Sequence, residues 1–222
     1  MKITVLGTGV VGNTIGTKLI QLGHEVKMGS RTATNEKAGA WAKTNGAKAS
    51  HGTFADAAAF GELIFNCLNG MATLEALKLA GEKNLKGKIL IDLSNPLDFS
   101  KGFPPTLSVC NNDSLGEQIQ KTFPDAKVVK TLNSMNCVLM VNPSLVPGDH
   151  SVFVGGNDEM AKATTKKILN SFGWKDQNII DMGDITTARG TEQLLPIWVR
   201  LYGKFKHASF NFNIVMGEVA KK

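Results

Sequence analysis

Residues 3–12 read Ile3-Thr4-Val5-Leu6-Gly7-Thr8-Gly9-Val10-Val11-Gly12, an apolar run that ends in a glycine-rich turn. The apolar run is too short for a helix and is stopped by glycine, so it predicts a buried parallel strand. Apolar residues then recur at helical spacing up to Leu22, and Gly23 ends that pattern. Residues 24–28 predict a second strand. The opening of the chain therefore predicts a strand, a turn, a helix and another strand.

The glycines of the turn have separate expected roles. Gly7 permits a tight bend, Gly9 lets the backbone approach a pyrophosphate, and Gly12 lets the helix pack closely on the strand. The phosphates would lie at the helix N-terminus, where unpaired amides and the positive end of the helix dipole favour an anion. Because the motif follows a predicted strand and opens a predicted helix, it predicts dinucleotide binding.

The end of the second predicted strand indicates which dinucleotide binds. NAD enzymes usually place an acidic residue about 20 residues beyond the glycines, where it accepts a hydrogen bond from the ribose 2′-hydroxyl. This chain has Ser30 and Arg31 in that region. A carboxylate would repel a 2′-phosphate, whereas a guanidinium and a hydroxyl can donate to it. The prediction is NADP.

Length and composition indicate one globular domain. The 222 residues are too few for two full-sized domains, and 42% of them are hydrophobic and 20% charged. No apolar run reaches the length of about 18 residues that could span a bilayer. Since Met1 and Lys2 lead straight into the first strand, we expect a cytoplasmic protein. The net charge of +6 is spread along the chain, so we expect neither a nucleic-acid nor a membrane partner.

The cysteines and histidines indicate no metal site. Cys67, Cys110 and Cys137 are far apart and lack C-x-x-C spacing, and the four histidines form no pair at ligand spacing. We therefore expect reduced, structural cysteines and no metal.

The rest of the chain alternates between predicted strands and helices, which predicts an α/β fold with a Rossmann-type doubly wound, mostly parallel sheet. Further strands are expected at residues 47–49, 62–68, 88–93, 126–130, 151–155 and 178–181. Further helices are expected at residues 36–44, 53–57, 73–80, 114–120 and 158–172, with Thr53, Ser114 and Asp158 as caps. Strand 62–68 should be central, and residues 99–112 look irregular. Polar loops at 69–73, 94–98 and 131–136 follow strands, where ligands gather in such sheets.

The C-terminal part differs in character. Residues 194–202 carry a helical apolar stripe interrupted by Pro196, which predicts a helix that is kinked there or begins shortly before it. Phe205, Phe210 and Phe212 follow and are too apolar for a free tail. We therefore divide the chain into an NADP-binding domain, 1–183, and a helical segment, 184–222. We expect that segment to pack on the domain or on a second subunit in a homodimer.

The chain resembles the NADP oxidoreductase family that reduces the 8-hydroxy-5-deazaflavin coenzyme F-420, and the related cytoplasmic reductase domain of six-transmembrane ferric reductases. The resemblance covers nearly the whole length. It is carried by Gly7-Thr8-Gly9 to Gly12, Gly29-Ser30-Arg31, Asp92-Leu93-Ser94-Asn95-Pro96-Leu97, Val128-Val129-Lys130-Thr131-Leu132-Asn133 and Ala188-Arg189.

The resemblance implies a set of site residues. Besides the glycines, Ser30 and Arg31, it implies that Thr8, Val10 and Val11 line the pyrophosphate. Leu68, Asn69 and Gly70 would flank the nicotinamide ribose, and the cofactor-binding set also includes Ser94 and Asn95. Asn133 and Met135 would face the ring that exchanges hydride with the nicotinamide. Deazaflavin-reducing enzymes carry histidine at the position of Asn133 and proline at that of Asn136. Asparagine at the first of these positions is more like the ferric-reductase branch and uncharacterised bacterial members.

The predicted function is hydride transfer between NADP(H) and a flavin, deazaflavin or similar planar acceptor. Such a transfer needs two rings in contact and no protein acid or base, so catalysis would consist mostly of positioning. No catalytic acid or base is assigned. The alternative is a catalytically silent NADP(H)-binding sensor, which would also lack an acid. The loop from Asn133 to Asn136 favours the enzyme, because it leaves a polar site opposite the dinucleotide.

Overall fold

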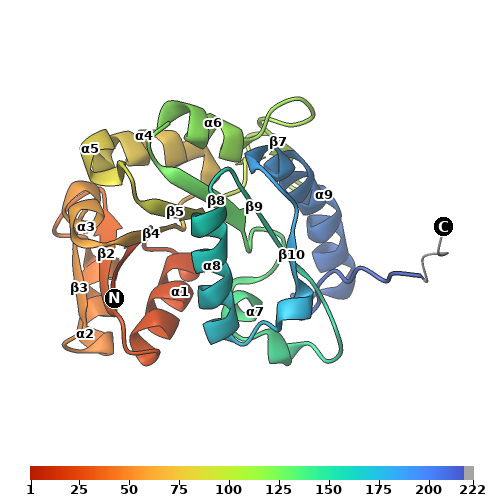
Figure 1. The fold of residues 1–222 in the computed structure, drawn as a ribbon, viewed down its shortest axis with the longest axis horizontal. Coiled ribbons are helices and arrows are strands. Elements are labelled where there is room, and N and C mark those ends of the chain that lie inside the picture. The colour runs from red at the N-terminus through yellow and green to blue at the C-terminus, as the bar shows by residue number, and fades with distance from the viewer. Residues whose placement is uncertain (218–222) are drawn as a thin grey trace.

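The computed structural model describes residues 1–217 (Figure 1). Its main sheet has eight strands in the order β10-β9-β8-β5-β4-β1-β2-β3. The strands are β1 (Lys2–Leu6), β2 (Glu25–Ser30), β3 (Ala49–Thr53), β4 (Leu63–Asn66), β5 (Ile89–Asp92), β8 (Lys127–Thr131), β9 (Val152–Gly156) and β10 (Ile179–Asp181). A separate antiparallel pair joins β6 (Leu97–Asp98) to β7 (Thr106–Leu107).

The sheet is parallel from β3 to β8, β9 pairs antiparallel with β8, and β10 pairs parallel with β9, so these last two strands run opposite to the other six. The predicted Rossmann-type, mostly parallel α/β fold is therefore confirmed. Strand β4 lies between β1 and β5, in the middle of the sheet, as its continuous apolar sequence predicts.

Helices cover both faces of the sheet (Figure 1). They are α1 (Val10–Gln21), α2 (Glu36–Asn45), α3 (Phe54–Phe60), α4 (Gly70–Ala80), α5 (Glu82–Leu85), α6 (Leu115–Thr122), α7 (Cys137–Val141), α8 (Glu159–Phe172) and α9 (Ala188–Phe205), with 3-10 turns η1 (Pro143–Leu145), η2 (Asp176–Asn178) and η3 (Ile185–Thr187). Helices α1, α2, α7 and α8 share one apolar core, and α3, α4, α5 and α6 share the other. Strand β1 serves both cores, because Val5 points into the first and Leu6 into the second.

The predicted caps are present. The side chains of Thr53, Ser114 and Asp158 accept hydrogen bonds from the amides three residues on, at 3.1, 3.1 and 2.8 Å. These bonds satisfy amides that have no acceptor inside the helix, which is why α3, α6 and α8 begin where the sequence predicts.

The strand predicted at residues 47–49 is wrong in position. The amide of Ala49 donates to the carbonyl of Gly46 at 2.9 Å, so the chain is still turning before Ala49, and β3 pairs with β2 from Ala49 to Thr53. An edge strand with one neighbour tolerates polar residues such as Ser50, and so no apolar run marked it. The same ladder extends β2 to Ser30, two residues beyond the prediction.

Several short elements were not predicted, among them β6, which lies in the loop expected at residues 94–98. The stretch 99–112 was expected to be irregular but contains β7, while α5 and α7 have four and five residues. None is long enough to display a period in the sequence. Helix α4 begins at Gly70, three residues before its predicted start, because Asn69 caps it.

The C-terminal helix α9 passes through Pro196 without interruption and begins at Ala188, well before the proline. Beyond it, the ring of Phe210 lies 5.4 Å from that of Trp198, and the carbonyl of Phe212 accepts from the amide of Ser151 at 2.8 Å. The division at residues 183 and 184 stays a prediction, and its last residues, 218–222, lie outside the described part. Among residues 1–217, no helix is both long enough and apolar enough to cross a membrane.

Candidate functional site

The predicted site residues lie at the carboxyl ends of five neighbouring strands, β2, β1, β4, β5 and β8. Residues 30–31 follow one end of this series and residues 132–136 the other, with loops 7–9, 67–69 and 93–96 between them. Ligands of doubly wound sheets bind outside such ends. Since the loops are far apart in sequence, the fold brings them together.

The glycine loop leaves space where a ligand would need it. Gly7 has φ +115°, and a methyl group on it would lie 2.7 Å from the carbonyl oxygen of Cys67. A methyl group on Gly12 would lie 2.0 Å from the carbonyl oxygen of Gly7, whereas one on Gly9 would meet no described atom within 4 Å. Gly7 and Gly12 are therefore required by close packing, and Gly9 faces open space.

Helix α1 begins beside this open space. Its first backbone bond runs from the Asn13 amide to the Gly9 carbonyl at 2.9 Å, so the amides of Val10, Val11 and Gly12 find no acceptor within the helix. Within the described residues, no side chain caps α1, and no acidic residue lies in its first turn. These amides, beside the half-buried Thr8, could donate to a pyrophosphate.

Ser30 and Arg31 differ in how available they are. The Ser30 hydroxyl is buried and donates to the Thr32 carbonyl at 2.6 Å. Arg31 is exposed and makes no ion pair with any carboxylate of the described residues. Of the two, the guanidinium is the group that is free to reach an anion.

The loops after β4 and β5 touch. A methyl group on Gly70 would lie 1.9 Å from the Asn95 carbonyl oxygen, so only glycine fits there. Asn69, next to it, caps α4 by accepting from the Met71 amide at 3.0 Å, and Leu68 is half-buried. This contact fixes the start of α4 against the β5 exit.

The loops after β5 and β8 are joined by two asparagines. Asn95 Nδ2 donates to the Asn133 carbonyl at 2.8 Å, and Asn133 Nδ2 donates to Asn95 Oδ1 at 2.9 Å. Leu132, just before, has φ +61° although it is a buried leucine. A leucine in the left-handed region is strained, and strained backbone is often found at functional sites. The strained residue here directly precedes Asn133.

The loop after β8 returns to the glycine loop through α7. Thr14 Oγ1, one turn into α1, lies 3.7 Å from Cys137 Sγ at the start of α7. Loops 7–9, 67–69, 93–96 and 132–136 thus touch one after another, and the helices that follow the first and the last of them, α1 and α7, touch each other. We call these four loops the strand-exit ring. Three predicted residues of the strand-exit ring are less accessible than expected. Met135 is packed in the core, Ser94 is buried with its hydroxyl donating to Asp92, and Asn133 is only 3% exposed.

A buried ion cluster, which the sequence did not reveal, lies beneath the strand-exit ring inside the protein. Lys130 Nζ lies 2.8 Å from both Asp92 Oδ2 and Glu192 Oε1 and donates to the Ser94 carbonyl. Burial disfavours the charged lysine, but the two carboxylates outweigh it and raise the pKa of Lys130. Glu192 also accepts from the first amides of α6, at 2.9 and 3.0 Å. The cluster therefore joins β5, β8, α6 and α9.

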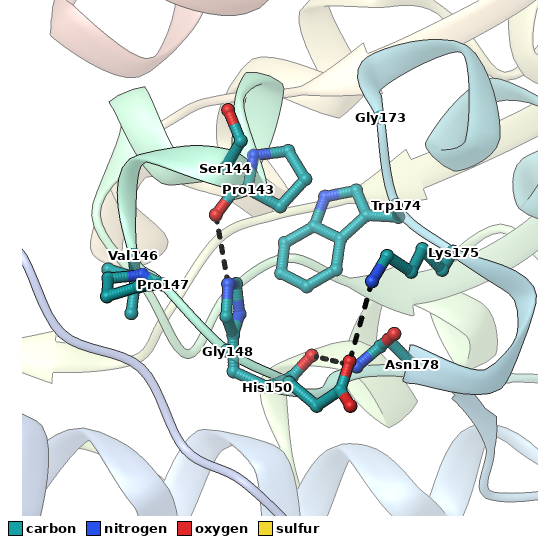
Figure 2. A pocket seen from close by; sticks show the side chains of 11 residues that line it. Pro143, Ser144, Val146, Pro147, Gly148, His150, Gly173, Trp174, Lys175 and Asn178 are labelled. Atoms are coloured by element: carbon teal, nitrogen blue, oxygen red, sulfur yellow. Dashed lines mark hydrogen bonds and ion pairs between the residues drawn. The ribbon is translucent and has the colours of Figure 1, made fainter.

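A hollow of about 250 Å³ lies away from the predicted residues, between loop 143–150 and the end of α8 (Figure 2). His150 Nε2 faces the Pro143 carbonyl at 2.9 Å, and the Asn178 amide donates to the His150 carbonyl at 2.9 Å (Figure 2). Lys175 faces Asp149 at 3.7 Å. Because these polar groups already bond to one another, none of them is left in the hollow to bind a ligand. Within residues 1–217, no cluster of His, Cys, Asp or Glu could hold a metal ion.

The fold and the glycine loop define a dinucleotide-binding α/β protein, and comparison with known proteins gives its family. Residues 2–96 match the profile described as NADP oxidoreductase, coenzyme F420-dependent. The chain is 53% identical to a protein of known structure from Arthrobacter sp. FB24, provisionally assigned as an F420-dependent NADP-reductase, with a TM-score of 0.93 over 97% of this chain and 100% of that one.

A more distant relative and a protein that shares only the fold were also found. The chain is 29% identical over 203 residues to Metalloreductase STEAP3 of Rattus norvegicus, covering 89% of this chain but only 38% of that protein. A Streptomyces aurantiacus imine reductase is 20% identical with a TM-score of 0.65, over 93% of this chain and 64% of that one, and shows the shared fold alone. The chain belongs to the NADP oxidoreductase, coenzyme F420-dependent, family and is an NADP-dependent oxidoreductase.

Proposed function

We propose that this enzyme transfers hydride between NADP(H) and a planar acceptor of the flavin or deazaflavin type. The observation that carries the proposal is the strand-exit ring, which gathers the open glycine loop and the Asn95–Asn133 pair at one edge of the sheet. When bound, NADPH supplies a hydride to the acceptor ring, and solvent supplies the accompanying proton. Family membership favours this enzyme over a silent sensor.

We propose that different loops at the carboxyl ends of the strands bind different parts of the cofactor. The amides of Val10 and Val11 and the side chain of Thr8 hold the pyrophosphate, and Arg31, helped by Ser30, holds the 2′-phosphate. Leu68, Asn69 and Gly70 lie against the nicotinamide ribose. Asn95 and Asn133 brace each other, so the loops on both sides of the reacting rings stay fixed, and that rigidity is what positional catalysis requires.

The acceptor is identified by steady-state NADPH oxidation with riboflavin, FMN, the deazaflavin coenzyme and ferric citrate. Turnover with a flavin or the deazaflavin that exceeds turnover with ferric citrate supports the proposal. Tight NADPH binding with no turnover of any acceptor would favour the sensor. Turnover with ferric citrate alone would place the activity with the metalloreductase relative.

We also propose a homodimer formed through α9. Its outer face exposes Ile197, Tyr202 and Phe205, and the tail adds Ile214. Exposed apolar residues gathered on one element mark interaction surfaces.

A further inference from the structure

Two helices begin at the strand-exit ring in the same way. Asn69 accepts a hydrogen bond from the amide of Met71 at 3.0 Å at the start of α4, and Asn136 accepts from that of Val138 at 3.1 Å at the start of α7. Met71 and Val138 are therefore each the second residue of an asparagine-capped helix. Both are apolar, and both stay exposed, by 60% and 50%.

The helices that carry these two side chains begin at the strand-exit ring but lie on opposite faces of the sheet. Helix α4 belongs to the core that contains Leu77, whereas α7 belongs to the core that contains Leu139. Gly70, just before Met71, packs on Asn95, and Asn136, just before Cys137, ends the loop that begins at Asn133. Met71 and Val138 therefore lie at the starts of two helices on opposite faces of the sheet, which follow the loop packed on Asn95 and the loop that carries Asn133.

We propose that Met71 and Val138 form an apolar clamp for the ring of the hydride acceptor, an inference that rests on the proposed function. A single exposed apolar side chain is ordinary, but two in equivalent positions at the starts of these two helices form a slot with apolar edges. The flat aromatic faces of a flavin or deazaflavin ring would remove both side chains from water, and methionine adapts its shape to such a partner. A hydrated ferric chelate gains nothing from them.

The test replaces each clamp residue by serine. Met71→Ser and Val138→Ser are expected to raise both the KM and the Kd for riboflavin roughly 5- to 15-fold, because each removes apolar contact with the ring. Riboflavin is the probe because it carries no phosphate. The Kd is measured by quenching of riboflavin fluorescence in the presence of NADP+, where no turnover occurs. The Kd for NADPH and turnover with ferric citrate are expected to stay within about twofold of wild type.

Met160→Ser is the matched control. Met160 is also the second residue of a capped helix, α8, and is 74% exposed. Because α8 follows β9, which runs antiparallel to β8, Met160 lies at the opposite edge of the sheet. Its replacement should leave riboflavin binding unchanged.

The outcomes separate the two proposals. If wild type uses a flavin but both clamp variants keep its KM and Kd, the clamp is refuted and the proposed function stands. If wild type turns over no acceptor yet binds riboflavin with a Kd that the variants weaken, the clamp stands and the proposed reaction fails. Equal losses with riboflavin and ferric citrate would refute selection by ring shape. No riboflavin binding to wild type would refute the clamp.

Discussion

At the scale of single residues, the proposed preference for NADP over NAD rests mainly on Arg31. Ser30 was predicted beside it, but its buried hydroxyl already donates to the Thr32 carbonyl at 2.6 Å. The Ser30 hydroxyl could donate to a phosphate only if its hydrogen bond to the Thr32 carbonyl were broken. Arg31 has no such commitment among the described residues, and its charge is always present.

Arg31→Ala should therefore weaken NADPH binding by about 1–2 kcal/mol, the loss expected for a charge-assisted hydrogen bond, and leave NADH binding nearly unchanged. Fluorescence titration with both dinucleotides measures this. Lys48→Ala, at an exposed lysine that bonds only the Gly23 carbonyl in the described chain, controls for lost positive charge. Equal affinity of wild type for NADPH and NADH would contradict the NADP assignment.

Lys130 illustrates how burial changes the value of an ion pair. Its contact with Asp92 measures 2.8 Å at 1% exposure, and that of Lys86 with Asp125 measures 2.9 Å at 69% exposure. Lys130→Met should destabilise the fold by about 3–5 kcal/mol, because it leaves two buried carboxylates unpaired. Lys86→Met should destabilise the fold far less, because solvent screens this exposed pair. Urea unfolding at pH 7 compares them, and similar shifts would show that burial does not matter here.

At the scale of elements, the sequence predicted the helices and strands that show a regular spacing of apolar residues. It missed the features that depend on contacts between residues far apart in the chain. The first strands, the glycine turn and the caps follow from local rules, and they are found in place. Helix α7 is too short to show a period, and Asn133 was expected to face a ring although it pairs with Asn95, 38 residues away. No local pattern in the sequence marks Glu192. Its burial beside Lys130 arises only when α9 packs on the sheet.

The link between α6 and α9 is sensitive to pH. Arg189 donates to Glu117 at 2.8 and 2.5 Å, and this bond, more than any other cause, lowers the pKa of Glu117. The folded state thus favours the ionised carboxyl. The resulting stability is fully present above the unfolded pKa of about 4.3 and is lost as the pH falls through the lower folded value.

Glu117→Gln should therefore lower the free energy of unfolding by about 0.5–1 kcal/mol at pH 7, a modest effect because Arg189 is partly exposed. The difference from wild type should narrow as the pH falls below about 4. Thermal unfolding across this range measures it. Glu75→Gln, at an exposed glutamate with no ion pair in the described chain, should match wild type throughout. A difference independent of pH would contradict the assignment to charge.

At the scale of the molecule, the C-terminal segment is held to the sheet from two directions. Glu192 enters the buried cluster with Lys130, and Asn211 Nδ2 lies within hydrogen-bond distance of the Ser151 carbonyl and His150 Nδ1, at 3.0 and 2.9 Å. Since His150 Nε2 faces a carbonyl, it is the nitrogen that carries the proton, and Nδ1 accepts from Asn211. Thr191, Glu192, Leu195 and Val199 of α9 are buried, whereas its exposed side carries Ile197, Tyr202 and Phe205 beside the polar Gln193, Arg200 and Lys204.

Replacing one residue of that outer face should break the proposed dimer. Ile197 is 52% exposed, so Ile197→Lys adds a charge at little cost to the folded monomer but places it in the proposed interface. Size-exclusion chromatography with light scattering should find wild type as a dimer at micromolar concentration and the variant as a monomer. Leu79→Lys, at a leucine 51% exposed on α4, should stay dimeric. A wild type that remains monomeric at every concentration, or an Ile197→Lys that still dimerises, would show that α9 does not form the interface.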